Sequence, residues 1–308
     1  MKLLFAGTPA TALPALTAVL DAGHDVVAVA SNPDAPVGRG QRLVASPVAA
    51  EARWLGIKLM QPQRAREPGF IDAVTGLDVD VAIIVAWGQL IPDGLLDVPK
   101  HGWINLHFSL LPAWRGAAPV QRAIMAGEST TGVTTFRLVH DLDAGPVWRQ
   151  LAVSIGQDET AGDLLDRLAV VGANVLVQTL DDVAAGAVPQ PQPTSGVSLA
   201  PKITAVDARV DWTRPVAVVV NQVRGVTPWP GAWTMLDGQR LKICQVMPYS
   251  TAAEGLAPGD LLATKRQLLI ATGDGLLELT TVQAPGKPPM AGADWARGAR
   301  LNPGARCE

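Results

Sequence analysis

The chain contains only two cysteines, Cys244 and Cys307, in 308 residues. Two thiols so far apart provide neither a disulfide framework nor a cluster of zinc ligands, and such usage is typical of proteins from a reducing compartment. Charge is also scarce, since charged residues make up 17% of the chain and hydrophobic residues 48%. Because disordered chains have the opposite balance, the composition predicts a globular protein, long enough for two domains.

Long uncharged apolar runs are absent as well. The longest uncharged stretches, such as residues 168–180, are shorter than the roughly 20 residues that a membrane helix needs. Residues 1–6 are mostly apolar, but Gly7 and Pro9 interrupt this run, so we expect no secretory signal. The sequence therefore predicts a cytoplasmic protein without a membrane partner.

A strong positive charge, which would let a protein coat nucleic acid, is missing too. The formal net charge is -3 at pH 7. The charges are unevenly distributed, because residues 1–205 carry 14 Lys and Arg against 19 Asp and Glu, whereas residues 206–308 carry 11 against 9. Any contact with nucleic acid must therefore come from local basic patches.

The first part of the chain alternates between apolar runs and helical patterns. We expect strands at 2–6, 25–30, 79–86 and 102–108, with helices at 9–22, 46–56 and 68–75. Near-continuous apolar strands separated by helices predict an α/β fold with a doubly wound, mostly parallel sheet of the Rossmann-like type. A long helix at 160–186 closes this predicted domain.

A change of composition marks a domain boundary. Residues 188–205 are rich in proline and have almost no helical period, which is typical of a stiff linker. Short strands with tight turns follow a predicted helix at 215–224 and indicate a small antiparallel β-barrel, similar to an OB-fold. We therefore expect a catalytic domain at 1–187, a linker at 188–205 and a barrel domain at 206–308.

The best indication of chemistry is an alternation of polar side chains at the end of the predicted strand 102–108. Asn105, His107 and Ser109 are spaced two positions apart, so an extended chain directs all three toward one face. Ligands of open α/β sheets bind beyond the carboxyl ends of the strands. An amide, an imidazole and a hydroxyl at this edge therefore indicate a functional site.

Two loops are further candidates. Residues 140–146 are rich in turn formers and contain Asp143, which on this pattern alone is an ordinary turn aspartate. Residues 31–47 form a long connection that we expect to lack regular structure, with Arg39 and Arg42 in a stretch free of acidic residues. Long connections of this kind are often functional, so this one is either a solvated loop or a basic element that contacts phosphates.

Two other kinds of site are open on the residues alone. The histidines could assemble a metal site, although no compact ligand motif supports one; its members would be His101, His107 and His140 with Asp141 or Asp143. A nicotinamide site at the first strand-to-helix turn would need the full Gly-x-Gly-x-x-Gly pattern, which residues 5–9 lack. A tight structural turn is the better interpretation there.

The motif Asn-x-His-x-Ser-Leu-Leu-Pro at 105–112, followed by Trp-Arg-Gly-Ala-Ala-Pro at 114–119, resembles the active-site signature of the folate-dependent formyltransferases. The Leu-Asp-Ala-Gly segment resembles their Leu-Asp-Thr-Gly segment. The resemblance covers nearly the whole chain and implies that Asn105, His107 and Asp143 are catalytic. Asn105 and protonated His107 would stabilise the oxyanion of a tetrahedral intermediate, while Asp143 would raise the pKa of His107 and help to relay the amine proton.

The same resemblance implies a folate site. The segment Ala-Trp-Gly-Gln-Leu-Ile resembles the folate-pocket segment of the family, with tryptophan where tyrosine is usual. The residues implied to bind the co-substrate 10-formyltetrahydrofolate are Ala86, Trp87, Gly88, Gln89, Leu90 and Ile91, together with Ser109, Leu110, Leu111 and Pro112. No metal is implied. Phe108 stands where glycine is common and Ala113 where arginine is common, so the rim of the site departs from the family pattern.

The basic loop and the second domain resemble the branch of the family that acts on initiator methionyl-tRNA. Gly38-Arg39-Gly40 is similar to the core of the loop that enters the tRNA acceptor stem, and residues 206–212 and 228–233 are similar to the start of the tRNA-binding domain. The resemblance implies tRNA contacts by Arg39, Arg42 and Lys202 and a monomer that formylates the methionine for translation initiation. Alternatives are a UDP-amino-sugar or another small amine, such as a purine precursor, as acceptor, or a non-catalytic RNA-binding module.

Overall fold

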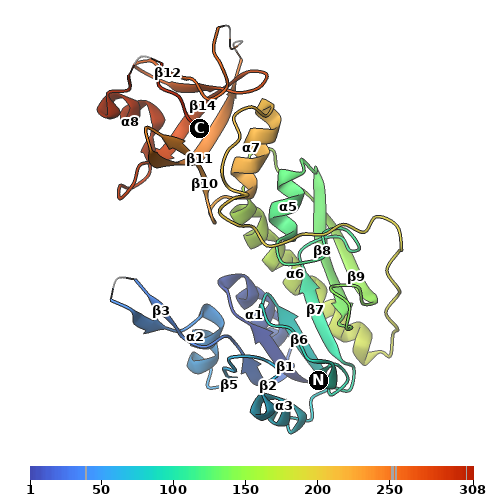
Figure 1. Ribbon diagram of the computed structural model, residues 1–308. Helices are drawn as coiled ribbons and strands as arrows, with labels where there is room; N and C mark the ends of the chain where they lie inside the picture. The colour runs from blue at the N-terminus through green and yellow to red at the C-terminus, as the bar shows by residue number, and fades with distance from the viewer. Residues whose placement is uncertain (39, 251–252, 254, 303) are drawn as a thin grey trace. The chain divides into compact units, whose positions relative to one another are not determined.

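The computed structural model describes residues 1–38, 40–250, 253, 255–302 and 304–308. The chain forms two compact units (Figure 1). The first unit comprises Met1–Pro119, Thr130–Ser154 and Leu165–Ala200, and the second comprises Val120–Ser129, Ile155–Leu164 and Pro201–Glu308.

The first unit is built on a seven-stranded sheet. Its spatial order is β5 (Lys58–Met60), β2 (Asp25–Ala30), β1 (Lys2–Gly7), β6 (Val81–Val85), β7 (Trp103–His107), β8 (Thr130–Arg137) and β9 (Val147–Ser154). The pairs from β5 to β7 are parallel, whereas β8 and β9 are antiparallel. The prediction of an α/β fold with a mostly parallel sheet is therefore confirmed.

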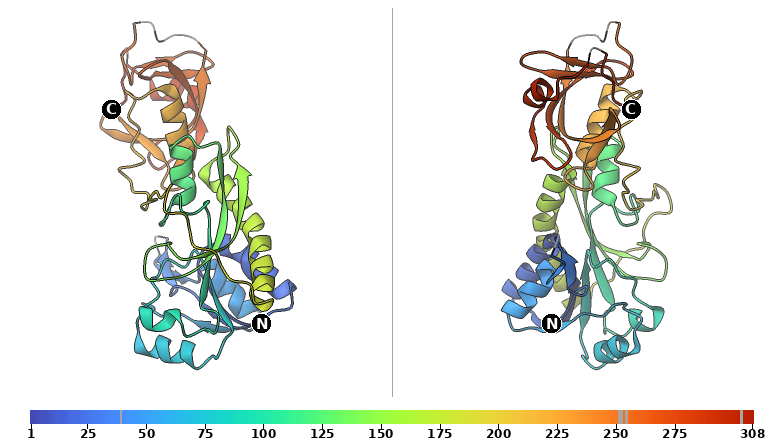
Figure 2. Two further views of the ribbon diagram at one scale, coloured as in Figure 1. Left: turned by 90° about the vertical axis from the view of Figure 1, so that its right-hand side faces the viewer. Right: turned by 60° about the vertical axis from the view of Figure 1, so that its left-hand side comes forward.

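Helices cover both faces of this sheet (Figure 2). The helical segments are η1 (Ala10–Ala12), α1 (Leu13–Asp21), α2 (Pro47–Trp54), α3 (Pro68–Thr75), α4 (Asp93–Leu96) and α6 (Ala161–Ala184). Buried residues of α3 and α4 pack against one face, which includes Trp103. On the other face α6 approaches so closely that a Cβ at Gly172 would lie 2.9 Å from the side chain of Leu106. Within the described part of the chain, no helix has the length and apolar character to cross a membrane.

The connection at 31–47 differs from our expectation. It contains a two-stranded hairpin, in which β3 (Ala35–Val37) pairs antiparallel with β4 (Arg42–Val44). Apolar side chains such as Leu43 remain 65% exposed, so cross-strand pairing rather than burial forms these strands. The prediction of a segment without regular structure was wrong because the hairpin lacks the alternating apolar pattern that would reveal it.

The second unit contains a curved antiparallel sheet. The path of hydrogen-bonded strands is β10 (Ala232–Leu236), β11 (Gln239–Tyr249), β14 (Leu276–Gln283), β13 (Leu268–Ala271) and β12 (Leu261–Ala263), and β15 (Met290–Ala291) also pairs with β14. The helices α5 (Pro119–Met125), α7 (Val216–Gly225) and α8 (Gly292–Ala299) accompany it. Buried aliphatic side chains of the sheet, of α7 and of α8 form its main core, and Leu269, Ala271 and Leu276 form a smaller, separate cluster. This half-barrel confirms the predicted β-barrel type of the second domain.

The C-terminal tail joins the two edge strands of the half-barrel. The Glu308 N–H donates to Met235 O on β10 at 2.9 Å, and the Cys307 N–H donates to Gly259 O at 2.9 Å, just before β12. Cys307 is buried, and burial raises the pKa of its thiol to about 12. The tail therefore completes the backbone pairing of this unit, a role that its short and mixed sequence does not reveal.

Candidate active site

Asn105 and His107 lie on the same face of β7, near its carboxyl end. Asn105 is partly exposed, and its side chain forms no hydrogen bond with any described residue. His107 is only 6% exposed, with its ring edge-on to Phe136 of β8. The site thus combines an amide whose donors are available with an imidazole that the protein surrounds.

The hydrogen bonds of His107 define its tautomer. Its Nε2 lies 2.9 Å from the carbonyl oxygen of Trp114, which can only accept, so Nε2 carries the proton. Its Nδ1 faces Asp143, with Oδ2 at 3.9 Å. Burial lowers the pKa of His107 below its usual value and outweighs the opposing effects of the Asp143 charge and the Trp114 carbonyl. The resting ring is therefore neutral near pH 7, with Nδ1 unprotonated.

Asp143 is held by its backbone conformation and by one hydrogen bond. Its φ of 46° lies in the left-handed region, which aspartate tolerates better than most residues. Its Oδ2 accepts a hydrogen bond from the Gly116 N–H at 2.8 Å. Gly116 has φ 125°, and a Cβ there would lie 2.7 Å from Ala200 O. The loop that binds His107 through Trp114 therefore also binds Asp143, and Asn105 lies on the same face of β7 as His107.

The predicted folate residues after β7 differ in exposure. Ser109 is fully buried, and its hydroxyl donates to Ala113 O at 2.7 Å. Leu111 is also buried, and its N–H donates to the Thr134 hydroxyl. Leu110 and Pro112 are partly exposed. Ser109 and Leu111 therefore maintain the shape of this loop, while Leu110 and Pro112 remain open to a ligand.

The predicted folate residues after β6 also divide into two groups. Trp87 is 1% exposed and packs against Phe70, with ring centroids 5.6 Å apart, and its indole N–H has no partner among the described residues. The Gln89 side chain accepts from Ala65 N and donates to Asn32 Oδ1 at 2.8 Å. These two side chains support the edge of the sheet from inside. The exposed surface comes from the other members, Ala86, Gly88, Leu90 and, in part, Ile91.

The predicted tRNA residues are not part of this cluster. Arg42 lies on β4, where it pairs with Val37 in the hairpin, and it is exposed. Lys202, in the second unit, is exposed as well. Neither forms an ion pair with another described residue. Arg39 lies outside the described residues.

The histidines do not form the metal site that the sequence left open. His140 is exposed and pairs with Asp93, with 2.9 Å between Nδ1 and Oδ1. Throughout the described part of the chain, no three His, Cys, Asp or Glu side chains gather closely enough to hold a metal ion. The charged contact of His107 is Asp143, as the formyltransferase resemblance implies.

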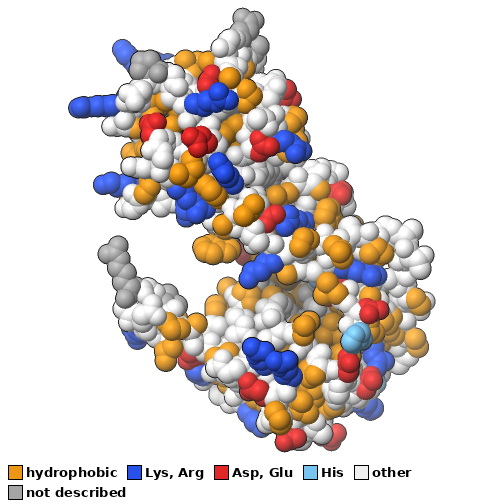
Figure 3. Space-filling view, in the orientation of Figure 1, with side chains coloured by type: hydrophobic (Ala, Val, Ile, Leu, Met, Phe, Trp, Pro, Cys, Tyr) orange, Lys and Arg blue, Asp and Glu red, His pale blue; other side chains and the backbone are white. Residues whose placement is uncertain are grey.

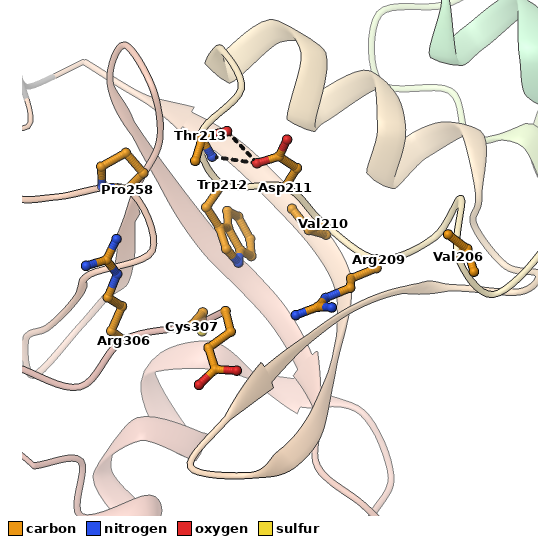
Figure 4. Close-up of a pocket in the computed structure, with 10 residues that line it drawn as sticks. Val206, Arg209, Val210, Asp211, Trp212, Thr213, Pro258, Arg306 and Cys307 are labelled. Carbon is orange, nitrogen blue, oxygen red and sulfur yellow. Dashed lines mark hydrogen bonds between the residues drawn. The ribbon is translucent and has the colours of Figure 1, made fainter.

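The second unit has basic residues and a pocket of its own. The guanidinium groups of Arg209 and Arg240 lie 5.7 and 4.2 Å from the ring centroid of Trp233, and neither pairs with a described carboxylate. Figure 3 shows several Lys and Arg side chains protruding from this unit. A pocket of about 550 Å³ is lined by Arg209, Trp212 and Arg306, among others (Figure 4). These exposed cations with an aromatic ring suit a nucleic-acid backbone.

Sequence reasoning missed the residues that support the site from behind. The Gln192 Nε2 donates to the carbonyl oxygens of Asp143 and Gly145, each at 2.8 Å, and the Ser198 hydroxyl accepts from the Trp114 N–H at 2.9 Å. Both lie in the proline-rich segment that composition identified only as a linker. No motif marks them, since their importance comes from contacts distant in sequence.

Comparisons with known proteins find similar sequences along nearly the whole chain. A family model described as formyl transferase matches residues 1–180, and one described as formyl transferase, C-terminal domain, matches residues 202–300. The chain is 52% identical over 308 residues to a methionyl-tRNA formyltransferase of Streptomyces coelicolor, covering 99% of each chain. It is also 52% identical over 307 residues to that of Thermobifida fusca, again covering 99% of each.

Solved structures share the fold at low sequence identity. WlaRD, a sugar 3N-formyl transferase, has a TM-score of 0.67 at 18% identity, with 94% of this chain and 99% of that chain covered. HypX from Aquifex aeolicus in complex with tetrahydrofolic acid has a TM-score of 0.66 at 19% identity, with 96% of this chain and 47% of that chain covered. At these identities the likeness is one of architecture.

Proposed function

The chain belongs to the formyl transferase family, and we propose that it transfers the formyl group of 10-formyltetrahydrofolate to the amino group of methionine on initiator tRNA, for translation initiation. The main supporting observation is that the Asp143 carboxylate lies 3.9 Å from His107 Nδ1, with Asn105 on the same face of β7 as His107. Full-length relatives with that named activity support methionyl-tRNA as the acceptor. The proposal includes a cytoplasmic location and a monomeric enzyme.

Asn105 stabilises the oxyanion. When an amine attacks a formyl carbon, negative charge develops on the carbonyl oxygen, and donors already aimed at that oxygen lower the barrier. The Asn105 amide has no competing partner among the described residues, so it loses no existing hydrogen bond when it donates.

His107 accepts the proton that the attacking nitrogen must lose. The neutral ring has its free lone pair on Nδ1, and the cation formed on protonation lies 3.9 Å from the Asp143 carboxylate, which stabilises it. The protonated ring then supports the oxyanion electrostatically. Direct donation from Nε2 would require its hydrogen bond to Trp114 O to be exchanged for one to the substrate.

The exposed surface beside this centre fits a folate. Accessible backbone is present at Ala86 and Gly88, and the apolar side chain of Leu90 is 86% exposed. Further apolar surface comes from Leu110 and Pro112. A flat heteroaromatic ring with hydrogen-bonding edges needs this combination. The bound folate supplies the activated formyl group.

The tRNA is held by basic residues of both units. Arg39 and Arg42, both within residues 31–47, contact the acceptor stem, and Lys202 contacts the tRNA body. Arg209 and Arg240 add positive charge in the second unit. A small sugar nucleotide has no need of so many separate basic positions.

One competition assay tests the proposal. The protein is supplied with 10-formyltetrahydrofolate and, in separate reactions, methionyl-tRNA, a UDP-amino-sugar or glycinamide ribonucleotide, and formylated products are identified by mass spectrometry. We expect formyl-methionyl-tRNA alone. Formylation of the sugar nucleotide or of glycinamide ribonucleotide would replace the proposed acceptor, and no product with any acceptor would favour a non-catalytic RNA-binding module.

A further inference from the structure

The proline-rich segment after α6 is bound to the active-site loops along its length. We call residues 190–200 the strap. At its start, Gln190 and Val147 of β9 exchange two backbone hydrogen bonds, of 2.7 and 2.8 Å. Figure 1 shows the strap as the yellow segment that runs beside β9. At its end, the Ala200 N–H donates to Arg115 O, and Ala200 O accepts from the Ala118 N–H. The strap thus belongs to the first unit and is not a free linker.

Gln192 is the one strap side chain that binds both active-site loops. Its Nε2 donates to Asp143 O and Gly145 O, and its Oε1 accepts from Arg115 Nη2 at 2.7 Å and from Arg115 Nε at 3.2 Å. A neutral amide has two donor hydrogens and two acceptor lone pairs, so all four positions are used. Glutamate at this position could satisfy Arg115 but not the two carbonyl oxygens.

These contacts determine how Asp143 meets His107. The loop at 114–116 binds His107 through Trp114 O and Asp143 through Gly116 N. Gln192 fixes the loop through Arg115 and the turn through Asp143 O, so it sets the distance between the two elements. Without the Gln192 amide, two carbonyl groups of the turn that contains Asp143 lose their donor from the strap, and the turn is held to the loop by the Gly116 N–H alone among these contacts.

We propose that Gln192 is a positioning residue for the reaction described above: by clamping the turn at 143–145 to the loop at 114–116, it holds the Asp143 carboxylate beside His107 Nδ1. This inference rests on the proposed function for its catalytic consequence, whereas its structural part is independent of the acceptor. Gln192 does not contact the reacting atoms itself. Displacements of about 1 Å in a catalytic group can cost up to about 100-fold in rate.

Gln192→Glu distinguishes the contact of Gln192 with Arg115 from its contacts with the turn at 143–145. The carboxylate keeps the acceptors for Arg115, but it places an oxygen against the carbonyl oxygens of Asp143 and Gly145, where it repels the turn. The matched control is Gln190→Ala. The Gln190 side chain donates only to Val188 O, and its backbone bonds to Val147 survive the substitution.

Two measurements on the full-length protein test the proposed role of Gln192. Steady-state assays with 10-formyltetrahydrofolate and methionyl-tRNA should show kcat reduced about tenfold or more in Gln192→Glu, with both KM values almost unchanged. An NMR titration, with the His107 signal assigned by its loss in His107→Gln, should show a lower His107 midpoint in Gln192→Met, which removes the two amide donors without adding a charge. The only charged group that acts on the ring among the described residues is Asp143, because Phe136 and Trp114 are neutral. Gln190→Ala should match the wild type in both measurements.

The two readouts distinguish failure of this inference from failure of the proposed function. If the wild type fails to formylate methionyl-tRNA, the proposed function is wrong, and the NMR titration still tests the clamp. An unchanged His107 midpoint in folded Gln192→Met would overturn the inference, as would an unchanged kcat of Gln192→Glu in an active enzyme. If either variant does not fold, Gln192→Ala removes the same two donors. It should also lower the midpoint, and no change would again overturn the inference.

Discussion

The Nε2 of His107 lies 2.9 Å from the carbonyl oxygen of Trp114, and this contact decides which ring nitrogen is available for chemistry. Because a carbonyl oxygen can only accept, the neutral ring keeps its proton on Nε2 and presents the Nδ1 lone pair to Asp143. Seven positions of sequence separate the two residues, and the turn at the end of β7 brings them together. The tautomer thus follows from the shape of one loop.

The first prediction concerns the two side chains on β7. His107→Ala and Asn105→Ala should each lower kcat about 100-fold or more, because each removes a group that acts chiefly on charge in the transition state. His140→Ala is the control, since that histidine is exposed and pairs with Asp93 instead. Single-turnover formylation and circular dichroism give the rate and the fold. Near wild-type turnover in either variant would exclude the assigned role.

The second prediction concerns the pH dependence that Asp143 produces. The charge of Asp143 raises the pKa of His107, so Asp143→Asn should lower that pKa further. Because the neutral ring is the active form, activity is lost as pH falls through the His107 pKa, and the acidic limb should shift to lower pH. Turnover should also fall about 100-fold, since the protonated ring loses its stabilising partner. Asp141→Asn, an exposed neighbour, should leave the pH profile of kcat where it was.

The third prediction concerns the basic hairpin. Replacing Arg39 and Arg42 by alanine should weaken use of methionyl-tRNA and leave folate affinity nearly unchanged. The log–log salt dependence of tRNA binding should flatten by about 0.7 to 0.9 for each phosphate that the hairpin no longer neutralises. The control is Lys58→Ala, which removes an exposed positive charge from β5. The variant Lys202→Ala should weaken tRNA use less than the double variant does. Equal losses of tRNA and folate affinity would show that the hairpin is not an RNA-binding element.

The fourth prediction concerns closure of the second unit by the tail. Gly259 has φ 92°, and a Cβ there would collide with Cys307 O, so Gly259→Ala should destabilise this unit by about 3 kcal/mol. Gly238→Ala has a similar positive φ but open space around it, and should cost about 1 kcal/mol. Urea unfolding with hydrogen exchange at Met235, which pairs with Glu308, measures both. Equal destabilisation by the two variants would mean that the tail does not constrain Gly259.

Local sequence patterns were sufficient for β1, β2, β6 and β7 and for the helices α1, α2, α3 and α6, but not for β5, α4 or the hairpin of β3 and β4. Period-2 and period-3.6 apolar patterns report which face of a strand or helix is buried, and this depends on neighbours within a few residues. The same locality explains why Asn105 and His107 could be placed on one face of β7. The Leu-Asp-x-Gly and Gly-Arg-Gly segments added Asp143 and Arg39 only through resemblance, because a turn aspartate and a loop arginine have no distinctive pattern of their own.

Tertiary structure decided everything that depends on residues distant in the chain. Every residue of the segment 86–91 was a candidate for folate binding. The structure directs Trp87 and Gln89 inward instead, because their partners come from other parts of the chain. It also bound the proline-rich segment to the active-site loops. Gln192 contacts Asp143 only because the folded chain brings these two distant residues together. It also closed the half-barrel with Cys307 and Glu308. Sequence patterns record local burial, whereas these contacts join side chains or backbone groups to partners that lie far away in the sequence.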